Sequence, residues 1–278
     1  QRKSWDKLSK KEKKSAALLQ FGEKEWDALL AKDTEATDGK VPFSLKAINL
    51  EIKCGQTVAI IGGVGSGKSS LLAALLGEME ADIPFSVERA GTVAYAAQSA
   101  FIVNATVKEN ITFGRPWDER RYEEVLDACC LRDDLKTLTN GDASEIGEQG
   151  INLSGGQKQR LSLARAVYCD ADIVLLDDVL SAVDAHVGAH IWTEVICKML
   201  ATKTVVLVTH AVQYLPEVDQ IFVFKDGKIE EQGQYHHLLG GSGSGILAQL
   251  VDAHEADGAL LSERSGGGSG NTPRSGRS

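Results

Sequence analysis

The sequence predicts an α/β fold, with a mostly parallel sheet flanked by helices. Two observations lead to this prediction. Apolar, strand-like runs alternate with helical patterns between about residues 40 and 240. This alternation is typical of parallel strands joined by helical crossovers. The composition, 43% hydrophobic and 25% charged, is that of an ordinary globular protein.

The expected elements follow one another in a regular order. "FSLKAINLEIKCGQT", residues 43–57, alternates with period two and predicts an antiparallel hairpin at an edge. "TVAIIGG" predicts a strand, "KSSLLAALLGEM" a helix and "GTVAYAAQ" a second strand. "ERRYEEVLDACCL" and "QKQRLSLARAVY" predict two further helices. The strands "DIVLLDD", "TVVLVTH" and "QIFVFKDG" complete the pattern.

Charge and cysteine content exclude some classes of protein. A formal charge of −9 argues against a nucleic-acid clamp, which needs a basic face. The sequence contains no run of 18 apolar residues, so no membrane-spanning helix is expected. The five cysteines form no C-x-x-C motif and are expected to be reduced, mostly buried thiols in a cytosolic compartment.

A glycine-rich loop is the strongest motif. "GGVGSGKS", Gly62 to Ser69, fits G-x-x-x-x-G-K-[ST] between a predicted strand and a predicted helix. Its N–H groups are expected to surround phosphate oxygens, with Lys68 supplying a cation and Ser69 a hydroxyl for Mg²⁺. The expected nucleotide contacts here are Gly62, Gly63, Val64, Gly65, Ser66, Gly67, Lys68, Ser69 and Ser70.

A second anion site is expected at "LSGGQ". Ser154, Gly155, Gly156 and Gln157 begin a predicted helix but bring no lysine of their own. A phosphate-binding segment of this kind suggests a site that two domains complete together.

Two adjacent carboxylates, Asp177 and Asp178, end the strand "DIVLLDD". Paired acids at the C-terminal end of a strand favour metal and water chemistry.

In these motifs the sequence resembles the nucleotide-binding domains of ATP-binding-cassette (ABC) proteins, whose signature is LSGGQ. The resemblance implies ATP and Mg²⁺ as ligands, with Ser69, Gln98 and Asp177 at the metal. It implies catalytic roles for Asp178, Gln98 and the switch histidine His210. Residues 181–184 match the loop that reaches across the ABC dimer, and "GEQG" at 147–150 the loop that touches the membrane domains.

The subtype resembles the first nucleotide-binding domain of multidrug-resistance-associated exporters, subfamily C. This implies a second nucleotide-binding domain as head-to-tail partner, transmembrane domains contacted through coupling helices, and a place at the cytoplasmic face of a membrane. We expect a charged linker at 1–25, the nucleotide-binding domain at 26–240 with a helical subdomain at about 100–168, and a Gly/Ser-rich linker at 241–278. The chain, which opens on Gln1, is then part of a longer one.

Two positions depart from the family pattern. Hydrolysing ABC sites carry Glu where this chain has Asp178, so a domain that holds ATP more than it splits ATP is expected. A regulatory nucleotide sensor is the alternative, because Asp178 suits both. The adenine-stacking aromatic is expected to be Trp26, with Phe43 as the other candidate.

Soluble ABC ATPases of DNA repair or translation fit less well. The span from Lys68 to Ser154 leaves no room for their long coiled-coil insertions.

Overall fold

The structure is a computed structural model that describes residues 44–79, 86–147, 153–240 and 245–254. Its main sheet has six strands in the order β2-β5-β6-β1-β7-β8. The strands are β1 (Thr57–Gly62), β2 (Val93–Ala96), β5 (Ile173–Asp177), β6 (Thr204–Val208), β7 (Gln220–Lys225) and β8 (Lys228–Gly233). All neighbouring strands are parallel except β7 and β8, which form a hairpin. The predicted α/β class, with a mostly parallel sheet, is confirmed.

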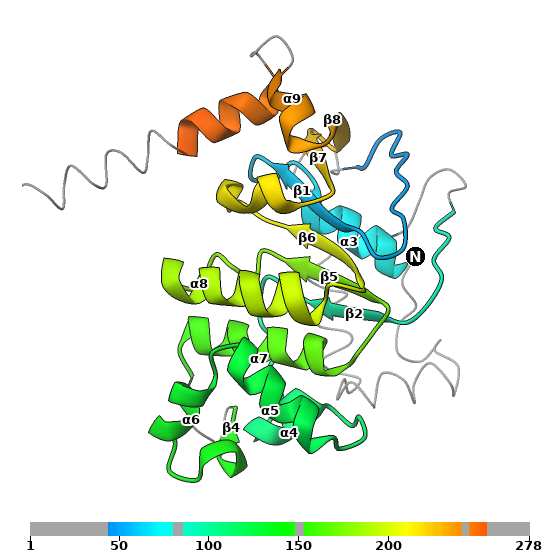
Figure 1. Ribbon diagram of the computed structural model, residues 1–278. Helices are drawn as coiled ribbons and strands as arrows, with labels where there is room; N and C mark the ends of the chain where they lie inside the picture. The colour runs from blue at the N-terminus through cyan, green and yellow to red at the C-terminus, as the bar shows by residue number, and fades with distance from the viewer. Residues whose placement is uncertain (1–43, 80–85, 148–152, 241–244, 255–278) are drawn as a thin grey trace, which may run out of the picture. The chain divides into compact units, whose positions relative to one another are not determined.

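The two faces of the sheet bury different helices (Figure 1). Val58 and Ile60 of β1 pack with Leu72 of α3 (Lys68–Leu76). Ala59 and Ile61 point to the other face, in the cluster that holds α5 (Glu119–Ala128), α7 (Gly155–Tyr168), α8 (Ala185–Ile191) and η3 (Trp192–Met199). Alternate residues of a strand point to opposite faces, so one apolar strand supplies two cores.

Short elements lie between β2 and α7. They are β3 (Ala105–Thr106), α4 (Val107–Thr112), α6 (Arg132–Thr137), η2 (Gly141–Ala143) and β4 (Glu145–Ile146). β3 and β4 pair antiparallel, and α4 packs against α7. The helix predicted over "ERRYEEVLDACCL" is α5, whose buried face holds Tyr122, Val125 and Leu126 as the periodicity predicts.

The C-terminal part carries η4 (Val212–Glu217), α9 (Tyr235–Gly240) and a helical segment over 246–254. Glu231 of β8 accepts hydrogen bonds from the backbone N–H groups of Ile246 and Leu247, at the start of that segment. Leu247 is fully buried. Among the described residues, no helix has the length and apolarity needed to cross a lipid bilayer.

The prediction of an antiparallel hairpin over residues 43–57 was wrong. Residues 44–56 form no strand. Ile48, Leu50 and Ile52 nevertheless pack as partly buried side chains on the α3 face of the sheet. Their alternation therefore reports burial of one side of the segment, whereas a strand also requires a ladder of backbone hydrogen bonds with a neighbour.

The cysteines are free, as expected, but they are not mostly buried. Cys129 is buried, whereas Cys54 and Cys197 are exposed. Cys54 lies in the turn before β1, and Cys197 lies on η3, where its Sγ donates to Glu217 Oε2 at 3.8 Å.

Candidate nucleotide-binding site

Four parallel strands bring the predicted residues to one edge of the sheet. Ile60 of β1 lies opposite Val208 of β6, which lies opposite Asp177 of β5. Ala96, at the end of β2, lies opposite Leu176. Ligands of parallel α/β sheets bind at the carboxyl ends of the strands. Segments far apart in the sequence therefore meet where β1, β2, β5 and β6 end.

The loop after β1 has a backbone that only glycine adopts readily. Gly62, Gly65 and Gly67 have φ angles of 151°, 78° and 108°. A Cβ on Gly62 would lie 2.2 Å from the backbone oxygen of Phe224, on β7. Gly62 therefore lets the loop leave β1 while staying close to the neighbouring strand.

Lys68 begins α3 and turns back into this loop. Its Nζ donates to the carbonyl oxygens of Gly62 at 2.8 Å and Gly63 at 2.9 Å. Burial lowers the Lys68 pKa, and the nearby carboxylates of Asp178 and Asp177 partly oppose this effect. The ammonium group is thus held at the mouth of the glycine loop.

Ser66 supports the assignment of the loop to a phosphate. Its Oγ is buried and has no hydrogen-bond partner among the described residues. A buried polar atom without a partner is costly, and such an atom often marks the place of a ligand. Val64, by contrast, is 97% exposed, as suits the tip of the loop. The loop residues fit a bound phosphate group.

Asp177 is held between two hydroxyl groups. Ser69 Oγ donates to its Oδ1 at 3.1 Å and the Tyr95 hydroxyl to its Oδ2 at 3.4 Å. Burial raises the pKa of Asp177. Burial and the neighbouring Asp177 also raise the Tyr95 pKa, to about 12, so Tyr95 stays a hydrogen-bond donor at neutral pH.

These oxygens suit Mg²⁺. The described residues include no group of three or more His, Cys, Asp or Glu able to hold a metal ion alone. Mg²⁺ characteristically takes one or two protein carboxylates and completes its shell with water and phosphate oxygens. Ser69 and Asp177 therefore fit a Mg²⁺ ion that a nucleotide shares.

Asp178 follows in a left-handed backbone conformation, with φ 53°. Its N–H donates to the Val208 carbonyl at 2.9 Å, which continues the pairing of β5 with β6. Its carboxylate accepts a long hydrogen bond, 3.4 Å, from Gln98 Nε2. The structure thus brings Gln98 and Asp178 together at this edge of the sheet.

His210 is exposed and lies two residues after the end of β6. The preceding Thr209 is almost fully buried, and its N–H donates to the Ile60 carbonyl at 3.2 Å. Thr209 Oγ1 accepts from the Ala211 N–H at 3.0 Å. These bonds fix the backbone on both sides of His210 beside the end of β1.

The signature segment starts α7. Ser154 caps the helix: its Oγ accepts from the Gln157 N–H at 3.3 Å, and its own N–H donates to Gln157 Oε1 at 2.9 Å. Ser154 and Gly155 are exposed. A Cβ on Gly156 would lie 2.9 Å from the Ala182 carbonyl, so α7 begins tightly against the loop after β5.

Some predicted residues fall outside the described part of the chain. These are Trp26, Phe43 and residues 148–150 of the "GEQG" loop.

Sequence reasoning missed three residues that shape the site: Tyr95, Thr209 and Asp134. Tyr95 breaks the apolar pattern of its strand, which was a usable signal. Thr209 directly precedes His210. Asp134 contacts Gln157 and Arg160, and no sequence pattern links these positions.

Comparison with known proteins agrees with this geometry. The family described as ABC transporter matches residues 45–181. The chain is an ATP-binding domain of the ABC transporter family.

Its relatives lie in subfamily C. The chain is 51% identical over 225 residues to ATP-binding cassette sub-family C member 2 of Mus musculus. It is 54% identical over 206 residues to sub-family C member 3 of Rattus norvegicus, and 50% over 212 residues to ABC transporter C family member 3 of Arabidopsis thaliana. The matches cover 80%, 73% and 76% of this chain, which spans 14% of the length of each relative.

Proposed function

We propose that this chain is the ATP-binding, weakly hydrolysing engine domain of an ABC exporter that moves organic anions, drugs or thiol conjugates. The main observation behind this proposal is that the two proposed phosphate-binding segments, the glycine loop and the signature, lie on opposite faces of the sheet. Lys68 begins α3, which packs on one face of the sheet, whereas Ser154 caps α7, which packs on the other. The signature is therefore free to serve the glycine loop of a second nucleotide-binding domain, arranged head to tail.

The residues at the edge of the sheet have separate proposed roles. The glycine loop and Lys68 bind the phosphates, and Ser69 and Asp177, with Gln98, would hold Mg²⁺. Mg²⁺, when bound, neutralises charge on the phosphate oxygens. Asp178 orients the attacking water together with His210. The Asp178 carboxylate is one methylene shorter than that of Glu, so we expect cleavage at this site to be slow.

Two exposed aromatic residues support docking of the membrane domains. Phe101 is 50% exposed and Phe113 is 45% exposed. The Arg165 guanidinium lies 5.8 Å from the Phe101 ring centre and 4.5 Å from that of Phe113. The three side chains form an aromatic and cationic patch, and Phe101 follows Gln98 by three residues. We assign this patch to contact with the coupling helices of the transmembrane domains.

A regulatory nucleotide sensor is the second candidate. Asp178 favours it as much as it favours a slow pump, because both hold ATP for long periods. ATP-dependent uptake of an organic anion into inverted vesicles containing the complete transporter distinguishes the two. A sensor gives nucleotide-dependent gating without such uptake.

Single-turnover ATP cleavage in the complete transporter, assigned to each site separately, tests the proposal. Lys68→Ala should abolish binding at this chain's site, and Lys53→Ala, an exposed lysine before β1, is the matched control. Ser154→Arg should stop cleavage at the partner's site while ATP still binds at Lys68. Robust hydrolysis by this chain alone, unaffected by dilution, would contradict a site completed by two domains.

A further inference from the structure

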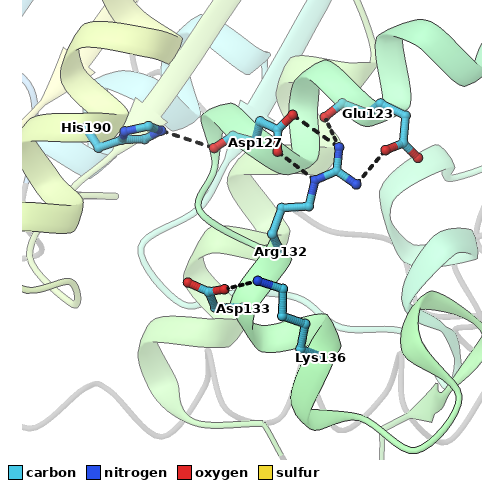
Figure 2. A network of polar contacts seen from close by, with 6 residues as sticks. All are labelled: Glu123, Asp127, Arg132, Asp133, Lys136 and His190. Carbon is cyan, nitrogen blue, oxygen red and sulfur yellow. Dashed lines mark hydrogen bonds and ion pairs between the residues drawn. The ribbon is translucent and has the colours of Figure 1, made fainter.

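Helix α6 is joined to α5 by the ion pairs of Arg132 (Figure 2). It also contacts the signature, through a hydrogen bond from Gln157 to Asp134. Arg132, its first residue, donates from Nε to Asp127 Oδ1 at 2.6 Å and also pairs with Glu123, both on α5. His190 of α8 contacts the Asp127 carbonyl at 3.1 Å. The start of α6 is therefore fixed to α5, which in turn contacts α8.

Two neighbouring aspartates of α6 face in different directions. The Asp133 side chain is 90% exposed, and its Oδ1 lies 2.7 Å from Lys136 Nζ. Figure 2 shows this pair. The Asp134 side chain is only 18% exposed and faces α7. Its Oδ2 accepts from Arg160 at 2.6 Å and 3.2 Å, and its Oδ1 accepts from Gln157 Nε2 at 3.0 Å.

The contact with Gln157 decides which way that amide points. An amide carries donors at one end and an acceptor at the other. Because Asp134 takes the Nε2 end, the Oε1 end accepts from the Ser154 N–H. Ser154 Oγ accepts a hydrogen bond from the Gln157 N–H. The Ser154 hydroxyl group can therefore donate its own hydrogen bond to a group outside the chain. Asp134, Gln157 and Ser154 thus form a directed chain of hydrogen bonds.

We propose that Asp134 is a positioning residue for ATP cleavage at the partner's site, acting through Gln157 on Ser154. The inference rests on the proposed function, in which Ser154 serves the ATP bound by the partner domain. A carboxylate is required because Gln157 and Arg160 both donate. An asparagine would turn a donor toward one of them and leave that pair unmatched.

The experiment uses the complete transporter and compares Asp134→Asn with Asp133→Asn, the matched change one residue earlier. Asp134→Asn should lower single-turnover cleavage at the partner's site about tenfold or more, the scale of a small misplacement. Binding of ATP at this chain's own glycine loop should not change. Asp134→Ala, which brings no competing donor, should act in the same direction if the asparagine variant fails to fold. An effect no larger than that of Asp133→Asn would overturn the proposal.

A double-mutant cycle separates positioning from a merely structural role. In a Gln157→Met background the amide is gone, so Asp134→Asn should cause no further loss of cleavage. Additive losses would show that Asp134 acts through the Arg160 ion pair and the packing of α6, and would overturn the proposal. If Ser154→Arg leaves the partner's site active, the proposed function itself fails. If Ser154→Arg stops cleavage and Asp134→Asn does not, only the further inference fails.

Discussion

Asp178 combines a left-handed backbone with a buried carboxylate. Its carbonyl accepts from Ser181 Oγ at 2.8 Å, and its N–H is bound to β6. Asp and Asn tolerate this conformation better than most residues do, because their short side chains can bond locally. The side chain therefore extends from a rigid backbone, and its length alone sets how far the carboxylate reaches.

We expect Asp178→Glu to raise ATP cleavage at this site by about tenfold or more in the complete transporter, with little change in ATP affinity. The added methylene restores the reach to the attacking water, whereas the glycine loop that binds the phosphates is untouched. Single-turnover cleavage assigned to this site measures the effect.

The matched control is Asp226→Glu, in the exposed turn between β7 and β8, where φ is 49°. It carries the same strain of a longer side chain in a left-handed backbone but lies in another turn. A flat cleavage rate in Asp178→Glu would mean that the reach of the carboxylate does not limit cleavage, and that the partner's signature or another part of the geometry does.

At the scale of elements, the glycine loop depends on how closely β1 approaches β7. Gly62 is the last residue of β1, and its Cα faces the carbonyl of Phe224. The loop is thus placed by a strand contact as well as by its own backbone preferences.

Gly62→Ala should destabilise the domain by more than the roughly 1–2 kcal/mol typical of a non-glycine residue in a left-handed backbone. The reason is that its Cβ would lie 2.2 Å from a backbone oxygen, which no side-chain rotation relieves. ATP binding should weaken at the same time, because the loop must shift. Urea unfolding and nucleotide titration measure the two effects.

Gly55→Ala is the control for this prediction. Gly55 has a φ of 79° in the turn before β1, and a Cβ there meets nothing within 4 Å. Gly55→Ala should lower the free energy of unfolding only by the cost of the left-handed backbone, and its ATP affinity should not change. Equal losses of stability in the two variants would contradict the steric argument.

At the scale of the whole molecule, several carboxylates tie elements together and have lowered pKa values. Hydrogen bonds from Thr92 lower the pKa of Asp172 and join β2 to β5. The hydrogen bond from Arg132 lowers the pKa of Asp127. Backbone N–H groups at the start of α8 lower the pKa of Asp184. Asp177 acts in the opposite direction, because burial raises its pKa.

We therefore expect the free energy of unfolding to fall in acid. A carboxylate with a lowered pKa stabilises the folded state above the ordinary value of 3.8, and this contribution is lost as the pH falls through the lower folded value. Urea unfolding between pH 7 and pH 3 measures the curve. Asp172→Asn should flatten it, whereas Asp226→Asn in the exposed turn should not. An unchanged curve in Asp172→Asn would contradict the assigned role.

The sequence by itself determined the fold class, the strands that carry the site, the glycine loop and the pair Asp177–Asp178. These features are local: a strand shows in the apolar run, and a phosphate loop shows in the spacing of its glycines and lysine. Gln98 was singled out only because it matches a position of the ABC family, and its contact with Asp178 comes from the structure.

Only the tertiary structure decided how distant side chains meet. It pairs Tyr95 with Asp177, 82 positions away, and Asp134 with Gln157, 23 positions away. It also leaves residues 44–56 without a strand despite their alternation, and it adds β8 as an antiparallel edge. Such contacts depend on how helices and strands pack across the core. A periodic pattern records which side of a segment is buried, but it does not record which partner covers that side.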